Sequence, residues 1–121
     1  MKTWTDPVTG LEWQINPPMR LVNWTEAKVY AAKLDLDGGG WRLPTKEELV
    51  TVSGGRVPTL HGKGWFWASS PMKDNDYAWY VYFDYDDIGG YAGVGYDGHV
   101  RCVRQWRSET VGSGPSQSKK P

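Results

Sequence analysis

The spacing of hydrophobic and polar residues predicts two short helices in the first half of the chain. Residues 23–34 begin with Asn23, a favourable helix N-cap, and Glu26 follows at the spacing of a capping box. The hydrophobic residues of this segment recur at helical spacing: Trp24, Ala27, Ala31 and Leu34. Thr45 and Glu48 repeat the capping box before a second short hydrophobic run. We expect both helices to lie on one flank of a small sheet.

Apolar stretches bounded by turn residues predict extended segments at both ends of the chain. Residues 3–15 contain two such stretches around Asp6-Pro7 and Thr9-Gly10, which predicts a β-hairpin. Residues 65–70 are rich in aromatic side chains and stop at a proline. Residues 99–106 form the last predicted strand, and its apolar members, Val100, Cys102 and Val103, favour a central position in a sheet.

Residues 78–84 alternate between two sets of side chains, as a half-buried strand does. One set, Trp79, Val81 and Phe83, is predicted to face the core. The other set, Tyr80, Tyr82 and Asp84, is predicted to face solvent or a partner.

Glycine and small polar residues dominate the two segments that remain. Residues 85–98 contain five glycines, which predicts a long loop or an irregular hairpin. Residues 108–121 are rich in Ser, Gly and Pro, with Val111 as the apolar exception, and this composition is typical of a flexible tail. We therefore divide the chain into one domain, residues 1–107, and a tail, residues 108–121.

Composition narrows the class of protein. A chain of 121 residues is long enough for one core, and eight Trp beside 15 Gly and eight Pro favour a loop-rich fold held by buried rings. Its formal net charge of zero lacks the basic excess of nucleic-acid binders. No apolar run approaches the roughly 18 residues of a membrane span. No signal peptide is visible, and a phage particle and display on a cell surface are both compatible with this.

Six motifs, taken in their order and spacing, carry a resemblance to a known family. Over about residues 3–104 the chain resembles the domain found at the C-terminus of bacterial collagen-like adhesins and in other bacterial and phage proteins. The motifs are Trp4-Thr5-Asp6-Pro7-Val8-Thr9-Gly10-Leu11-Glu12-Trp13, Trp24-Thr25-Glu26-Ala27, Gly40-Trp41-Arg42-Leu43-Pro44-Thr45-Lys46-Glu47-Glu48-Leu49, Trp67-Ala68-Ser69-Ser70, Ala78-Trp79-Tyr80-Val81-Tyr82-Phe83 and Val100-Arg101-Cys102-Val103-Arg104.

The resemblance implies an α+β, C-type-lectin-like fold. Such a fold has two short helices packed on a twisted antiparallel sheet, long loops, and paired terminal strands. Similar domains often carry a cysteine in the first helix that pairs with one in the last strand, but here Cys102 is the one cysteine of the chain. The absence of this disulfide bond is consistent with folding in a reducing environment. Members of the family look mostly like ligand-binding modules, and some resemble the variable proteins of diversity-generating retroelements.

An acidic and aromatic segment is the strongest candidate for a binding surface. Residues 74–98 contain six of the seven tyrosines and six aspartates, with no Lys or Arg, and this mixture is typical of a paratope. The alternative is a solvated loop with half-buried rings. The candidate ligand-binding residues are Asp74, Asn75, Asp76, Tyr77, Tyr80, Tyr82, Asp84, Tyr85, Asp86, Asp87, Tyr91, Tyr96, Asp97 and His99.

Motifs for metals, cofactors and catalysis are incomplete. The acids that begin at Asp84 fit the first two positions of a calcium loop, but Ile88 and Gly95 occupy later ligand positions. Residues 93–98 fit G-x-G-x-x-G without the strand and helix that a dinucleotide site needs. Formylglycine-generating enzymes share the broader fold class but use paired cysteines. We expect no cofactor, no metal and no enzymatic activity, with Cys102 as a buried small hydrophobe.

The sequence thus predicts a recognition or adhesion domain, with a protein or a neutral glycan as ligand and with a homo-oligomer as one mode of display. The local acidity argues against nucleic acid as a partner. The alternative is a structural module for oligomerisation or decoration of a virion or adhesin. Residues 41–44, Trp41-Arg42-Leu43-Pro44, are distinctive but are expected to be structural, because Pro44 immediately precedes the cap at Thr45.

Overall fold

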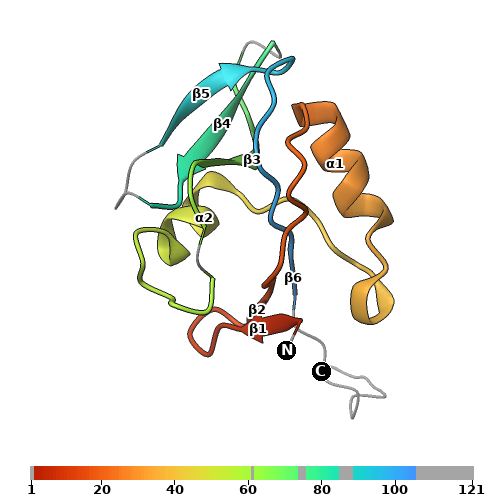
Figure 1. Cartoon of the computed structure of the whole chain (residues 1–121), viewed down its shortest axis with the longest axis vertical. Coiled ribbons are helices and arrows are strands. Elements are labelled where there is room, and N and C mark those ends of the chain that lie inside the picture. The colour runs from red at the N-terminus through yellow and green to blue at the C-terminus, as the bar shows by residue number, and fades with distance from the viewer. Residues whose placement is uncertain (1, 61, 74–75, 85–88, 106–121) are drawn as a thin grey trace, which may run out of the picture.

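The computed structural model describes residues 2–60, 62–73, 76–84 and 89–105. Its elements, shown in Figure 1, are β1 (Thr3–Thr5), β2 (Leu11–Gln14), α1 (Trp24–Lys33), the 3-10 turn η1 (Leu36–Gly38), α2 (Lys46–Val52), β3 (Trp65–Pro71), β4 (Tyr77–Tyr82), β5 (Gly89–Gly93) and β6 (Val103–Gln105). The predicted tail lies outside the described residues. No helix in the described part is long and apolar enough to cross a membrane.

Both predicted helices form, and each begins with a complete capping box. In α1, the Asn23 side chain accepts from the Glu26 amide at 2.9 Å, and Glu26 accepts from the Asn23 amide at 3.0 Å. Thr45 and Glu48 exchange the equivalent bonds at 3.1 and 2.8 Å at the start of α2. These reciprocal bonds satisfy backbone donors that the first helical turn leaves open.

The first sheet joins the two ends of the domain in the order β1-β2-β6, all antiparallel. It lies at the bottom of Figure 1. The predicted hairpin of residues 3–15 is confirmed by the pairing of Trp4 with Trp13. The last strand is shorter than predicted, because regular pairing covers β6 alone. The prediction of a central position is wrong, because β6 is an end strand of this sheet and β2 is the central one. On its outer side β6 has an isolated bridge, in which Val103 exchanges two 2.9 Å backbone bonds with Arg42.

The second sheet has the order β3-β4-β5, again antiparallel, and lies at the top of Figure 1. β3 and β4 match the strands predicted at residues 65–70 and 78–84. Of residues 85–98, predicted to form a long loop or an irregular hairpin, Gly89–Gly93 forms β5 and pairs with β4 over five positions, which favours the hairpin. Residues 85–88 lie outside the described residues. Glycine has low strand propensity, so the hydrophobic pattern of these residues did not predict a regular strand.

The core consists of two clusters, one on each face of β3. Phe66 and Ala68 point into the cluster that contains Leu49 of α2, whereas Trp67 points into the cluster that contains Ala27 of α1. Successive side chains of a strand point to opposite faces, so the two helices cover opposite faces of this sheet. The prediction that both helices lie on one flank is therefore wrong. The two helices have the same capping and hydrophobic pattern in sequence. The face of the sheet that each helix covers becomes visible only from the residues of β3 with which it packs.

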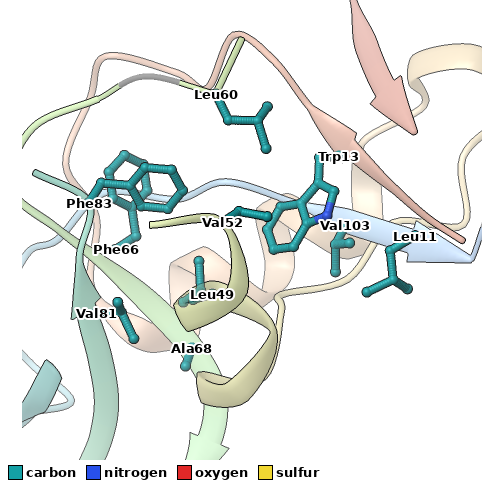
Figure 2. Close-up of a cluster of buried hydrophobic side chains, with 10 residues drawn as sticks. All are labelled: Leu11, Trp13, Leu49, Val52, Leu60, Phe66, Ala68, Val81, Phe83 and Val103. Atoms are coloured by element: carbon teal, nitrogen blue, oxygen red, sulfur yellow. The ribbon is translucent and has the colours of Figure 1, made fainter. Parts of the chain in front are cut away.

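The cluster beneath α2 connects the two sheets. Figure 2 shows the Trp13 indole pointing from β2 towards Val52 at the end of α2, with Phe66 and Phe83 on the far side. Trp13 is completely buried. Full burial of a large aromatic ring contributes about 1.5–3 kcal/mol by transfer from water. This contact fixes the first sheet, β1-β2-β6, which we call the terminal sheet, against the base of the β3-β4-β5 sheet.

Candidate functional site

The β4–β5 hairpin presents three aromatic rings on one face, which we call the hairpin aromatic cluster: Tyr77, Trp79 and Tyr91. The Tyr91 ring stands edge-on to Tyr77 at 5.8 Å and to Trp79 at 5.9 Å between ring centroids. The Lys46 ammonium lies 4.0 Å from the centroid of the Trp79 ring. Edge-to-face contacts of this kind stabilise aromatic pairs beyond their burial. The rings therefore form one connected surface.

The strand register explains why these rings meet. Tyr77 and Trp79 are two residues apart on β4 and share a face, and Trp79 pairs directly with Tyr91 of β5. Further along the same face Val81 is completely buried under α2. Tyr77 and Tyr91 lie beyond the cover of the helix and are 41% and 56% exposed. Trp79 is half-buried and packs against the core, so it anchors the two exposed rings.

Two predicted site residues, Tyr80 and Tyr82, lie on the opposite face and are half-buried. Tyr80 packs on Trp65 at 4.7 Å between centroids and stands edge-on to Tyr82 at 5.5 Å. Burial raises the pKa of Tyr80, with a smaller contribution from Tyr82. The alternation of β4 is confirmed by the burial of Val81 and Phe83. The second face is nevertheless not a free solvent face, because Trp65 covers part of it.

The turn after β5 carries the next group of predicted residues. Tyr96 is 67% exposed, and its amide donates to the Gly93 carbonyl at 3.0 Å. Asp76 and Asp97 are also exposed. Asp76 lies next to this turn, because the Val94 amide donates to the Asp76 carbonyl at 2.9 Å. This turn follows Gly93, which pairs with Tyr77 at the start of β4. The structure therefore brings Asp76, Tyr77, Tyr91, Tyr96 and Asp97 to one end of the β4–β5 hairpin.

His99 does not join this group. Its ring stacks on Phe66 at 5.0 Å and lines a hollow of about 530 Å³ together with Arg101 and Lys63. The other wall of the hollow is formed by residues 15–19. Burial, with the nearby Arg101 charge, lowers the pKa of His99, and burial lowers the pKa of Arg101 to about 10. The hollow contains no residue of β4 or β5.

The acidic part of the predicted surface is described only in part. Asp84 is exposed and accepts from the Gly64 amide at 3.2 Å. Asp74, Asn75, Tyr85, Asp86 and Asp87 lie outside the described residues. Within the described ranges, no three His, Cys, Asp or Glu side chains gather closely enough to hold a metal ion.

Sequence reasoning missed two contributors to the hairpin aromatic cluster. Trp79 was assigned wholly to the core, but it is half-buried and holds Tyr91 in place. Lys46 belongs to the first turn of α2, more than thirty residues away in sequence. No local pattern places a helical lysine over a strand tryptophan, because the contact depends on how α2 packs on β4.

The remaining motifs have structural roles. Cys102 is completely buried, and burial raises the pKa of its thiol to about 12, which leaves it protonated and unreactive at neutral pH. This confirms the prediction of a small buried hydrophobe. Trp41 and Leu43 are buried as expected, and Arg42 makes a two-pronged contact with Glu48 at 2.8 and 2.9 Å. The glycines of residues 93–98 form a turn that no helix follows.

Comparisons with known proteins agree with this fold. A family model described as the Lcl C-terminal domain matches residues 2–104. No curated protein sequence matches the chain. The solved structure of EMS16, described as an antagonist of the collagen receptor integrin alpha2beta1, is similar with a TM-score of 0.58 at 15% identity, over 87% of this chain and 98% of EMS16. EMS16 has a C-type-lectin-like fold, which confirms the fold class expected from the sequence.

Proposed function

Because the chain belongs to the family of Lcl C-terminal domains, we propose that it is a non-catalytic recognition module that binds its ligand through the hairpin aromatic cluster. The observation that carries the proposal is the exposure of Tyr77 and Tyr91 beside the anchored ring of Trp79. Tyrosine gives a large contact area at a low cost in side-chain entropy. Adjacent rings left exposed on a packed hairpin are typical of a surface that a partner covers.

The charge around the cluster restricts the class of ligand. Residues 74–98 contain six aspartates and no Lys or Arg. Of these, Asp76, Asp84 and Asp97 are exposed in the described part, and they outnumber Lys46, the base that contacts the cluster. A surface of this sign repels polyanions and attracts cationic or neutral partners, and salt weakens both effects. We therefore assign a protein or a neutral glycan as the ligand, and we expect neither nucleic acid nor sulfated glycans to bind this face.

A double variant tests the proposal directly. Tyr77→Ala with Tyr91→Ala removes two exposed rings and should leave the fold intact. Aromatic anchors cost about 2 kcal/mol or more on truncation, which corresponds to a loss of affinity of about 30-fold. Binding would be measured on arrays of neutral glycans, sulfated glycans and displayed peptides, followed by titration of each hit.

Val8→Ala with Met19→Ala is the matched control, because these side chains are 89% and 95% exposed and lie outside the hairpin. The control should bind normally. The absence of any neutral-glycan or peptide ligand, or undiminished binding by the tyrosine variant, would refute the proposal. If the tyrosine variant instead converts a multimer into monomers in sedimentation experiments, the cluster is an interface between copies and the role is structural.

Diversification of this surface is a finer proposal that depends on the resemblance to variable proteins of retroelements. The DNA around the gene tests it without the protein. A near-repeat of the segment that encodes roughly residues 70–104, differing at adenines and next to a reverse-transcriptase gene, would support it. If the surrounding DNA contains no such repeat, the proposal that this surface is diversified is wrong, and the proposed recognition function is unaffected.

A further inference from the structure

The outer edge of β5 has no strand partner among the described residues. β5 is the last strand in the order β3-β4-β5, and it pairs with β4 on one side. Figure 1 shows β5 at the margin of the molecule, on the side away from α1. An unpaired edge presents backbone donors and acceptors that another extended segment can use.

The pairing register identifies which backbone groups face outward. The Val94 amide donates to the Asp76 carbonyl at 2.9 Å, so Tyr77 and Gly93 form a non-hydrogen-bonded pair. It follows that Gly90 and Ala92 turn their backbone groups towards β4. Gly89, Tyr91 and Gly93 turn theirs outward, and the Gly93 carbonyl already accepts from Tyr96. The backbone of Tyr91 is therefore the centre of the open edge.

β5 lacks the features with which proteins usually protect such an edge. Its sequence, Gly89-Gly90-Tyr91-Ala92-Gly93, contains no proline and no charged side chain. Its small residues let another backbone approach closely. The exposed rings of Tyr77 and Tyr91 lie on one face of the same hairpin, where they can contact the side chains of an added strand.

We propose that β5 accepts an extended segment of a partner protein, as a fourth strand of the sheet, and that this segment carries basic side chains. The inference rests on the proposed recognition function and narrows its ligand to a protein strand. Backbone hydrogen bonds to Tyr91 provide the docking, and the tyrosine rings provide side-chain contacts.

Charge favours a basic partner strand over a second copy of this chain. Antiparallel pairing of two β5 strands about Tyr91 would bring the Asp84 end of one copy towards the Asp76 and Asp97 end of the other. Opposed like charges destabilise paired strands, whereas lysine or arginine at the same positions would be attracted. Two bases border the hairpin, Lys46 over the Trp79 ring and Lys73 in the β3–β4 connection, and the exposed acids Asp76, Asp84 and Asp97 outnumber them.

The probe is a capped peptide in which valine alternates with lysine, titrated into the full ¹⁵N-labelled chain and followed by NMR. The expected result is that the amides of Tyr91 and its outward-facing neighbours shift and become protected from hydrogen exchange. A peptide that alternates valine with glutamate should bind at least about tenfold more weakly. A lysine peptide N-methylated along one edge, which cannot donate from that edge, should also lose binding.

Two substitutions at one position separate the backbone from the ring. Tyr91→Ala removes the ring and keeps the outward N–H, whereas Tyr91→Pro removes both and is tolerated on an edge strand. We expect Tyr91→Pro to bind the lysine peptide at least about tenfold more weakly than Tyr91→Ala, since it lacks the docking donor. Melting curves establish that both variants fold. If Tyr91→Pro does not fold, the N-methylated peptide decides the question.

Four results would overturn the inference: no binding of the lysine peptide, equal binding by the two variants, full binding of the N-methylated peptide, or a Tyr91 amide that is already protected in the free chain. The last result would mean that the edge is occupied, by the rest of the chain or by a second copy. Binding of a neutral glycan through Tyr77 and Tyr91 without any peptide binding would remove this inference and leave the proposed function standing.

Discussion

The terminal sheet and the β4–β5 hairpin are both small antiparallel structures, yet they use their residues in opposite ways. Every residue of β2 is buried, including the polar Glu12 and Gln14, whereas β5 has no fully buried residue. Glu12 accepts from Arg104 at 2.8 Å, and Gln14 accepts from the Cys102 amide at 3.0 Å. The terminal sheet joins the first and last described strands with buried polar bonds, whereas the hairpin keeps Tyr77 and Tyr91 at the surface.

The difference shows how one small domain separates stability from recognition. In the terminal sheet, Glu12, Gln14 and Arg104 are buried and hydrogen-bonded within the protein, so losing one partner leaves buried groups without solvation. In the hairpin, the exposed rings contact one another and are anchored through Trp79. Substitutions should therefore reduce the free energy of unfolding in the first region and ligand affinity in the second.

The largest effect is expected at Arg104. Its guanidinium is buried, pairs with Glu12, donates to the carbonyls of Leu36, Asp37 and Gly39, and lies 4.4 Å from the Trp41 ring. Arg104→Ala should lower the free energy of unfolding by about 3–5 kcal/mol, the usual loss when one member of a buried ion pair is removed. Chemical denaturation measures it. Arg42→Ala is the control, because that side chain is 46% exposed, and it should cost about 1 kcal/mol or less. Equal losses would contradict the comparison.

Two tryptophans sharpen the contrast between buried and surface rings. Trp41 is 5% exposed and its indole N–H donates to the Leu36 carbonyl at 2.8 Å. Trp41→Ala should cost about 3–5 kcal/mol of stability. Trp79→Ala should cost about 1–2 kcal/mol, because the ring is half-buried, and it should also weaken ligand binding by releasing Tyr91. Thermal melts of both variants measure the stability, and the binding assay measures the affinity. A larger loss of stability in Trp79→Ala than in Trp41→Ala would contradict the comparison.

Two glycines of the turn after β5 test how closely this region is packed. A Cβ at Gly98 would stand 2.3 Å from the Trp65 ring, whereas a Cβ at Gly95 would meet nothing within 4 Å. Gly98→Ala should therefore cost about 1–3 kcal/mol through displacement of Trp65. Gly95→Ala should be nearly neutral in the same melting experiment. A neutral Gly98→Ala would mean that Trp65 moves freely and that the face around Tyr80 is loosely packed.

The smallest effect depends on pH and concerns Glu48. Hydrogen bonds from Arg42 lower the pKa of this carboxyl below its ordinary value. A lowered pKa in the folded state means that the stabilisation is fully present above the ordinary pKa of glutamate and is lost as the pH falls through the folded value. Glu48→Gln should cost about 0.5–1 kcal/mol at neutral pH, since the pair is partly exposed and glutamine can still accept from Thr45. Denaturation at neutral and acidic pH should show the two proteins converging in acid. A constant difference would exclude the carboxylate as the cause.

The amino-acid sequence by itself determined the local structure of this protein. Capping boxes at Asn23 and Thr45, the turn at Thr9-Gly10 and the alternation around Val81 each involve residues within a few positions of one another. Local hydrogen bonds and side-chain periodicity are written in such short patterns. The six motifs likewise sufficed to indicate the family and its fold.

Only the tertiary structure decided which aromatic rings are exposed and together. Tyr77, Tyr80 and Tyr91 look alike in sequence, but α2 begins at Lys46, over Trp79, and leaves Tyr77 and Tyr91 exposed, while Trp65 packs on Tyr80. The pairing of the glycine-rich β5, the separation of His99 from the hairpin and the opposite positions of α1 and α2 depend in the same way on contacts between distant segments. The alternation along a strand shows on which face of the sheet a side chain lies. Its exposure depends in addition on which other segments pack on that face, and the strand pattern does not contain this information.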